Sequence, residues 1–472
     1  MKRHVVFGTG MIAATCLGIL MLCADGPSRA GAQDLPAEEV VAVDYGSGQT
    51  FYPGPGFSPH AIIVKFDSHV PQAERLRIAQ ERRCWIAGSC AIGDFHLLGI
   101  PQSADPEQMV EVFAQHESVE YAELDYYVRV SFVPDDRLYP YQWNLNNAAK
   151  TDIRMQAAWE IETGDPNVIV AVIDTGVAYE DFDKYRQAPD LAKTRFVPGY
   201  DFVHDDDHPN DDHGHGTHVA GTIAQSTNNR IGVAGVAFNC SIMPIKAMDE
   251  QGIGDQFLVA RAILFAVAHG ARVINLSAGS PQSSNTLRQA VRTAYERGVT
   301  VVAAAGNDFT TGNRPSYPAA EKDFCIGVGA VRFDLKRSPY SNTGSYVSIV
   351  APGGDLGVDQ NLDGYPDGIL QQAFRSDPNE FAYWFFQGTS MAAPHVSGVA
   401  ALLASRGVTE PDKIREAIER TARDLGPRGR DNEYGWGMLD AQAALSYWMP
   451  DDRNGSRAVE ARAPAVRSAA TP

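Results

Sequence analysis

Four polar residues that could act together on a carbonyl group lie at the ends of elements of regular structure. Asp174 closes the apolar stretch VIVAVID, and Asn307 closes VTVVAAAGN. His215 lies where the glycine-flanked stretch DDHGHGTHVAG turns into a small-residue helix, and Ser390 opens the helix-like stretch GTSMAAPHVSG. Because ligands bind at the carboxyl ends of the strands in an open α/β sheet, these four side chains can share one site.

Such a set meets the requirements of acyl transfer through a serine hydroxyl. Serine needs an adjacent base, which is most often histidine, and a buried carboxylate such as Asp174 holds that imidazole in place. The Asn307 amide and the Ser390 N–H can donate to an oxyanion, and Gly388 leaves room for a substrate backbone. The alternative is that Ser390 only caps a helix, which is the commoner role of a Gly-Thr-Ser sequence.

The pattern of apolar residues predicts the strands and helices that would position these residues. Nearly uninterrupted apolar runs are typical of strands buried on both faces of a parallel sheet. They occupy residues 168–174, 241–248, 272–277, 299–307 and 324–331. Residues 255–270 and 284–298 read as crossover helices that each end at a glycine. We therefore predict a doubly wound α/β domain with a mostly parallel sheet over residues 132–450.

A smaller unit is predicted before it, over residues 59–131. Strands are expected at 61–66, 95–100 and 119–130, and helices at 70–83 and 104–116. This alternation favours a small α+β sandwich of ferredoxin-like arrangement. Residues 33–58 are rich in Gly and Pro and read as a linker, and residues 451–472 read as a disordered tail.

The first 32 residues have the features of a signal peptide. MKRH is positively charged, an apolar run follows, and AGA at 30–32 provides a small-residue cleavage site. A membrane anchor is the alternative, and Leu22 before Cys23 argues against a lipoprotein signal. We expect a secreted protein, extracellular or periplasmic. The formal net charge of −18 argues against nucleic acid as a partner.

Six cysteines are present, of which Cys16 and Cys23 would leave with the signal peptide. Cys84 and Cys90 are close enough in sequence to pair, whereas Cys240 and Cys325 each begin an apolar run. The pairing stays open at this point, because sequence alone does not fix connectivity.

The order Asp, His, Ser and the motifs VIDTGV, HGTHVAG, AAAGN and GTSMAAPHVSG resemble those of subtilisin-type serine proteases, over residues 132 to about 448. The resemblance implies a subtilisin-like fold, protein or peptide substrates and a monomeric enzyme. It implies that Asp174, His215 and Ser390 are catalytic and that Asn307 stabilises the oxyanion. It also implies that Ser277, Ala278 and Gly279 pair with an extended substrate, although Ala278 stands where the family more often has leucine.

Two further expectations follow from the resemblance. The 59–131 unit resembles the family's inhibitory pro-domain, so we expect self-cleavage near residues 130–133. Among the histidines, the HGTH motif selects His215. His218 and His395 are then expected to be structural, and His213 to be a solvated loop residue.

Two segments are predicted to bind calcium. DQNLDGYPD has oxygen ligands at alternate positions with a glycine after the third, as in the first half of an EF-hand loop, although an acidic turn is the alternative. Its candidate ligands are Asp359, Asn361, Asp363 and Asp367. TNNRIGVAGV resembles the family's tight calcium loop. The ligands that this likeness implies are the Asn229 side chain, the carbonyls of Thr227, Ile231 and Val233, and Asp190.

Three alternatives stay open. His204 and His208, with the carboxylates around them, could form a metal site or merely a solvated loop. The chain could also be a secreted peptide-binding protein on a catalytically silent protease scaffold, or a peptide ligase that uses the same acyl-enzyme. The presence of all three catalytic residue types together with Asn307 favours the protease.

Overall fold

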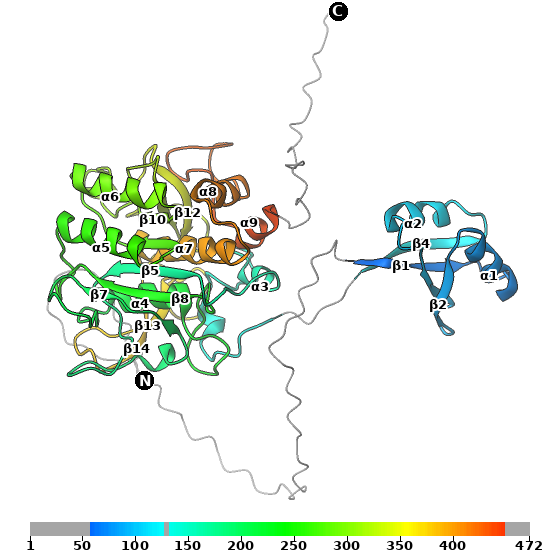
Figure 1. Cartoon of the computed structure of the whole chain (residues 1–472), viewed down its shortest axis with the longest axis horizontal. Coiled ribbons are helices and arrows are strands. Elements are labelled where there is room, and N and C mark those ends of the chain that lie inside the picture. The colour runs from blue at the N-terminus through cyan, green and yellow to red at the C-terminus, as the bar shows by residue number, and fades with distance from the viewer. Residues whose placement is uncertain (1–56, 127–131, 449–472) are drawn as a thin grey trace, which may run out of the picture. The chain divides into compact units, whose positions relative to one another are not determined.

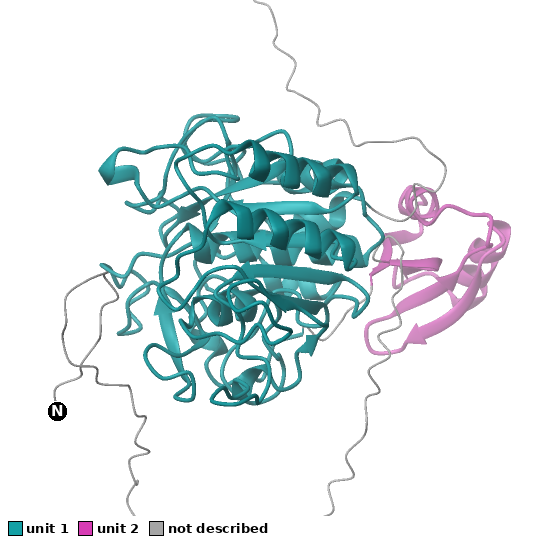
Figure 2. Ribbon diagram, turned by 60° about the vertical axis from the view of Figure 1, so that its left-hand side comes forward, with its two compact units in different colours: residues 1–24, 131–449 teal, residues 25–130, 450–472 magenta. Residues whose placement is uncertain are grey.

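The computed structural model describes residues 57–126 and 132–448. They belong to two compact units, which are coloured separately in Figure 2. The predicted signal peptide, most of the predicted linker, the junction at 127–131 and the predicted tail lie outside the described residues. Within the described part of the chain, no helix has the length and apolar character needed to cross a membrane.

The smaller unit has the order β1 (Phe57–Phe66), α1 (Gln72–Glu81), β2 (Trp85–Cys90), β3 (Phe95–Gly99), α2 (Pro106–Ala114) and β4 (Val119–Tyr126). Its sheet has the strand order β2-β3-β1-β4, with antiparallel neighbours. This is the ferredoxin-like topology. The sequence prediction missed β2, whose alternating exposed and half-buried residues lack a long apolar run. β1 also starts at Phe57, one residue before the predicted end of the linker.

The larger unit is built on a parallel sheet with the strand order β12-β11-β10-β9-β5-β8-β6 (Figure 1). The longer strands are β5 (Ile169–Asp174), β8 (Ser241–Lys246), β9 (Val273–Leu276), β10 (Thr300–Ala304), β11 (Cys325–Val331) and the edge strand β12 (Val347–Pro352). The short strands β6 (Arg195–Phe196) and β7 (Tyr200–Asp201) both pair with β8. Every residue of β8 to β12 is buried, which confirms the expectation of strands covered on both faces.

Two pairs of helices supply that cover. The helices α5 (Gln256–Ala268) and α6 (Asn285–Glu296) pack on each other and on β5, β8 and β10. The helices α4 (His215–Ala224) and α7 (Thr389–Ser405) also pack on each other, and α7 runs along β9 to β12. Asp255 and Ser284 cap α5 and α6, and each helix is followed by a glycine at positive φ. The predicted crossover helices are therefore confirmed to within two residues.

The remaining elements are short. They are η1 (Tyr139–Tyr141), α3 (Met155–Trp159), η2 (Pro189–Leu191), η3 (Phe309–Thr311), α8 (Pro411–Arg420) and α9 (Ala441–Tyr447). A separate hairpin pairs β13 (Ile369–Ala373) with β14 (Ala382–Phe386), and the sequence prediction did not include it or β12. The cysteines Cys84, Cys90, Cys240 and Cys325 are all free, so the pairing of Cys84 with Cys90 is absent from this structure.

Candidate active site

Three neighbouring strands of the large sheet deliver the candidate residues to one edge. Asp174 is the last residue of β5, Ser277 follows the end of β9, and Asn307 lies three residues beyond the end of β10. In the sheet these strands are adjacent, in the order β10-β9-β5, and parallel. The helices α4 and α7 begin at the same edge with His215 and with Thr389 and Ser390.

Asp174 and His215 form a partly buried hydrogen-bonded pair. The His215 Nδ1 lies 2.6 Å from Asp174 Oδ1, which also accepts the Thr175 N–H at 2.8 Å. Asp174 is fully buried, whereas the His215 side chain is 23% exposed. Burial lowers the pKa of His215, but the charge of Asp174 and its hydrogen bond more than offset this, so the pKa is raised above its ordinary value. With Nδ1 donating to Asp174, Nε2 is the ring nitrogen available as a base.

Ser390 lies in the first turn of α7 and is held close to the end of β9. Its hydroxyl donates to the Ser277 carbonyl at 2.9 Å, and the Ser277 hydroxyl donates to the Ser390 carbonyl at 2.8 Å. A rotation about the Ser390 Cα–Cβ bond redirects the hydroxyl. Before substrate binds, hydrogen bonds of this kind are often not yet aligned for reaction.

The donors expected for an oxyanion converge above Gly388. This residue has φ of +150°, and a Cβ built on it would lie 3.5 Å from both Asn307 Nδ2 and the Ser390 backbone nitrogen. A side chain there would fill the space that an oxyanion needs. The Asn307 amide is oriented by Thr389, whose backbone N–H and hydroxyl both donate to Asn307 Oδ1, at 2.9 and 3.0 Å. The amide nitrogen is thereby left to face the space above Gly388.

His215, Asn307 and Ser390 all line one open pocket of about 520 Å³. The proposed substrate segment begins beside it. Ser277 is buried, Ala278 is half-buried and Gly279 is exposed. The next residue, Ser280, exchanges two backbone hydrogen bonds with Tyr317, which holds this segment extended.

The other histidines differ in role from His215. His218 donates from Nε2 to two backbone carbonyls, and burial lowers its pKa to about 3. Burial likewise lowers the pKa of His395 to about 4, and its Nδ1 bonds the Met391 carbonyl. His213 is a loop residue, as expected; it is half-buried and lines the pocket that His215 shares with Ser390, with its ring 6.2 Å from that of His215.

The structure also adds pocket residues that the sequence reasoning missed. Phe374 and Arg375, which follow β13, and Phe385 and Phe386 of β14 line the same pocket. The alternation of aromatic residues in FAYWFF was the available signal for β14, but nothing in it predicts its proximity to Ser390.

The loop predicted to bind calcium at residues 227–233 wraps around the Asp190 carboxylate. Asn229 Nδ2 donates to Asp190 Oδ1 at 2.8 Å, and the Val233 N–H donates to Oδ2 at 3.1 Å. Burial raises the pKa of Asp190 to about 7, so its ionised form favours a positive partner. No described residue donates a hydrogen bond to the carbonyl oxygens of Thr227, Ile231 or Val233, so these oxygens fit the role of cation ligands.

The loop Asp359–Asp367 also has features that suit a cation. Asp367 is 1% exposed, and its Oδ1 has no hydrogen-bond partner. Burial raises the pKa of Asp367 to about 6, with Asp359 and Asp363 adding to the effect. Asn361 and Asp363 mainly bond within the loop, as they would in an acidic turn. No three His, Cys, Asp or Glu side chains among the described residues gather as a metal site, so bound calcium would also need backbone or amide oxygens.

Comparison with known proteins agrees with the fold. The model of the subtilase family, peptidase S8, matches residues 165–437. A thermophilic serine proteinase from Bacillus sp. strain AK1 is 36% identical over 394 residues, covering 82% of this chain and 87% of that protein. Thermitase from Thermoactinomyces vulgaris is 38% identical over 295 residues, covering 62% of this chain and 94% of thermitase. A solved protease structure from Pseudoalteromonas arctica has a TM-score of 0.58 and 32% identity, covering 67% of this chain and 99% of that one.

The fold and these relatives define a subtilisin-type serine endopeptidase. The chain belongs to the subtilase family.

Proposed function

We propose that Asp174, His215 and Ser390 are the catalytic triad of a secreted endopeptidase. The main support for this proposal is the 2.6 Å contact between His215 and the fully buried Asp174. His215 lies at a pocket that Ser390 and Asn307 also line. His215 Nε2 takes the proton of the Ser390 hydroxyl as the oxygen attacks the scissile carbonyl. Asp174 holds the imidazole and stabilises its charged form.

The tetrahedral oxyanion then lies in the space above Gly388. Asn307 Nδ2 and the Ser390 N–H both approach that space, and they stabilise the developing charge. His215 returns the proton to the departing amine, and water hydrolyses the acyl-enzyme by the reverse sequence of proton transfers. The segment Ser277, Ala278 and Gly279 pairs with the substrate backbone on the acyl side, a mode that accepts many side chains.

A fluorophosphonate label tests this proposal and its two rivals. We expect stoichiometric labelling of Ser390 in the wild-type enzyme and none in Ser390→Ala. A chain that binds peptides but does not react would be the silent scaffold. A labelled enzyme that mainly joins peptides in the presence of excess amine would be the ligase.

We also propose that the chain is made as a precursor with a signal peptide at 1–32 and an inhibitory pro-domain at 59–131. The described part of that unit folds as a sheet with helices on one face. The opposite face presents the exposed aromatic residues Trp85, Phe95 and Tyr121, a surface suited to binding. The Ser390→Ala chain should remain in one piece after signal removal. The N-terminus of the active enzyme should lie between about Val130 and Asp136. An active enzyme that begins near Gln33 would be incompatible with a pro-domain.

Calcium is proposed as a structural cofactor at the two loops. Asp190, Asn229 and the carbonyls of Thr227, Ile231 and Val233 would hold one ion, and Asp359, Asn361, Asp363 and Asp367 a second. Bound calcium would neutralise the buried carboxylates and tie the loops to the folded state. Its role is stability, and no catalytic step passes through it. The mature enzyme is proposed to be an extracellular or periplasmic monomer that acts on proteins and peptides.

A further inference from the structure

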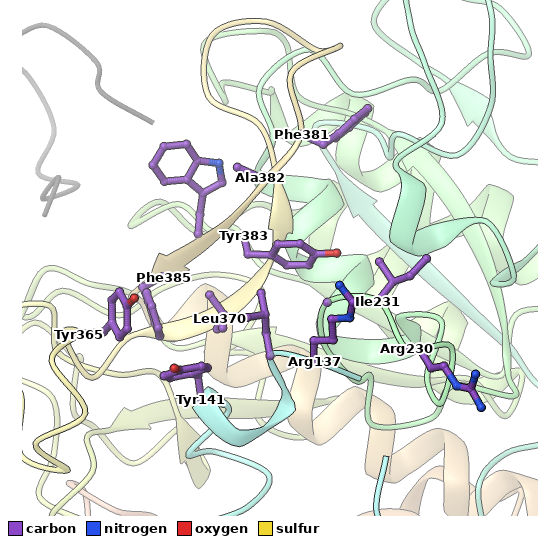
Figure 3. Close-up of a pocket in the computed structure, with 13 residues that line it drawn as sticks. Arg137, Tyr141, Arg230, Ile231, Tyr365, Leu370, Phe381, Ala382, Tyr383 and Phe385 are labelled. Atoms are coloured by element: carbon purple, nitrogen blue, oxygen red, sulfur yellow. The ribbon is translucent and has the colours of Figure 1, made fainter. Parts of the chain in front are cut away.

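A second cavity, of about 570 Å³, has no part in the catalytic steps proposed above (Figure 3). Phe381, Tyr383 and Phe385, at alternate positions on and just before β14, line one wall. Arg137 and Ile231 line the other wall. The cavity lies in the size range of about 300–1,000 Å³ that is usual for specific ligand sites.

The aromatic residues of this cavity, called the aromatic groove below, contact one another and are partly open to solvent. Tyr365 stacks on Phe385 with ring centroids 5.7 Å apart, and Tyr141 meets Tyr365 edge-on at 5.5 Å. Tyr383 is fixed by its hydroxyl, which donates to Asp190 at 3.3 Å. The aromatic residues are nevertheless only half-buried, so they offer apolar surface to a ligand without prior rearrangement.

The aromatic groove adjoins the catalytic pocket. Phe385 lines both cavities. Phe374 of the catalytic pocket meets Phe381 of the groove with ring centroids 6.0 Å apart. The strand β14 ends at Phe386, only four residues before Ser390. A chain that leaves the catalytic pocket along β14 therefore reaches the groove.

The strand β14 can also bind such a chain by its backbone. Among the described strands, β14 pairs only with β13, which leaves its other edge without a strand partner. A free strand edge can bind an extended peptide by main-chain hydrogen bonds. Because Ser277 to Gly279 are proposed to bind the acyl side of the substrate, β14 is left for the leaving-group side.

The charge at the groove favours a carboxylate. Arg137 lines the cavity and is exposed, and no carboxylate among the described residues pairs with it, whereas the nearby Arg230 pairs with Asp135. An acidic side chain or a C-terminal carboxylate of the ligand can supply that partner.

We propose that this groove binds the leaving-group side of the substrate and adds a specificity that the catalytic pocket does not provide. The inference rests on the proposed protease function. The five residues of β14 span about 17 Å, which corresponds to about five extended substrate residues. Large apolar or aromatic side chains roughly three to six residues beyond the scissile bond enter the groove, and an acidic residue there pairs with Arg137.

The test compares three substrates with the same acyl-side sequence. The first ends in an anilide and has no residues beyond the cleaved bond. The second carries a six-residue extension with Phe and Asp at positions three to five, and the third carries Gly and Ser there. We expect the second peptide to be cleaved with a kcat/KM about tenfold above that of the third, as burial of a large apolar side chain would give.

Two variants separate the contributions of the groove, with rates expressed per fluorophosphonate-titrated site. Phe381→Ser should remove the preference for Phe, and Arg137→Glu should turn the preference for Asp into one for Lys. Both should leave anilide hydrolysis unchanged. Phe257→Ser is the matched control, because Phe257 is an exposed aromatic residue of α5 outside the groove.

Equal cleavage of the two extended peptides would overturn the inference, and so would a preference that stays unchanged in both variants. In either case, hydrolysis of the anilide would still support the proposed protease function. If the wild-type enzyme did not hydrolyse the anilide, both the proposed function and this inference would be wrong.

Discussion

The orientation of the Asn307 amide offers a sharp test of the proposed oxyanion site. Two donors of Thr389 hold Asn307 Oδ1, the backbone N–H at 2.9 Å and the hydroxyl at 3.0 Å. The substitution Thr389→Val keeps the shape and the N–H but removes the hydroxyl. A neutral hydrogen bond contributes about 0.5–1.5 kcal/mol. At about 1.4 kcal/mol per tenfold change in rate, we expect kcat to fall about two- to twelvefold.

The same substitution has a separate cost in stability. The Thr389 hydroxyl also accepts the Gly306 N–H at 3.2 Å, and Thr389 is buried. Removal of that acceptor leaves a largely buried donor unpaired, which costs about 1–3 kcal/mol of folding free energy. A thermal melt measures this loss, so it is not confused with the loss of turnover measured well below the melting temperature.

A double-mutant cycle on a short anilide substrate isolates the coupling. Asn307→Ala alone should lower kcat by about 10²–10³, the usual cost of removing one donor to an oxyanion. Once Asn307 is absent, Thr389→Val should reduce kcat by little more, because no amide remains to be oriented. If the two losses multiply, Thr389 does not act through Asn307 and the reasoning is refuted.

Three further predictions concern the triad and the calcium loops. Ser390→Ala and His215→Ala should each lower kcat by several orders of magnitude and together by little more, whereas multiplied losses in steady-state assays would show that they do not act as a unit. The kcat/KM of the enzyme should rise with pH through a pKa above the ordinary value of histidine, because neutral His215 is the base and its pKa is raised. The substitution Asp174→Asn removes the negative charge that raises the pKa of His215 and leaves the burial that lowers it. The activity should therefore fall, and the acidic limb of the pH profile should move to lower pH. An acidic limb that does not move would contradict the assignment of His215 as the base. Chelation should lower the melting temperature and raise autolysis, Asp363→Ala should weaken the chelator's effect without loss of kcat, and a melt insensitive to both chelator and calcium would exclude the cofactor.

The parallel sheet and its two crossover helices could be predicted because each follows from a local pattern. Strands such as Val301 to Ala304 are buried on both faces and therefore apolar at every position, and α5 and α6 end where glycine permits positive φ. The strand β2 does not follow this rule. Its residues alternate between exposed and half-buried and include Gly88. Its place in the sheet depends on pairing with β3, which cannot be predicted from a short stretch of sequence.

The candidate residues were predictable for a similar reason, since Asp174, His215 and Ser390 each lie at the end or start of an element whose type the sequence shows. The contacts around them were not predictable. His213 is two residues from His215 and reads as a loop residue, yet the loop folds it into the catalytic pocket. Thr389 reads as part of a helix cap, and only the approach of β10 to α7 shows that its hydroxyl holds Asn307.

The hairpin of β13 and β14 would extend the proposed substrate-binding surface beyond the triad. The central strands bring Asp174, Ser277 and Asn307 together at one edge of the sheet. The surface that we propose for the leaving-group side of a substrate lies immediately before Ser390, on the edge strand β14, which ends close to the first turn of α7. The same strand packs through Tyr383 against Asp190, a proposed calcium ligand in η2. A cation there would hold the wall of the aromatic groove as well as the fold, so chelation should reduce the preference for extended substrates before it reduces hydrolysis of the anilide. Parallel loss of both activities on chelation would instead show that calcium acts only on global stability.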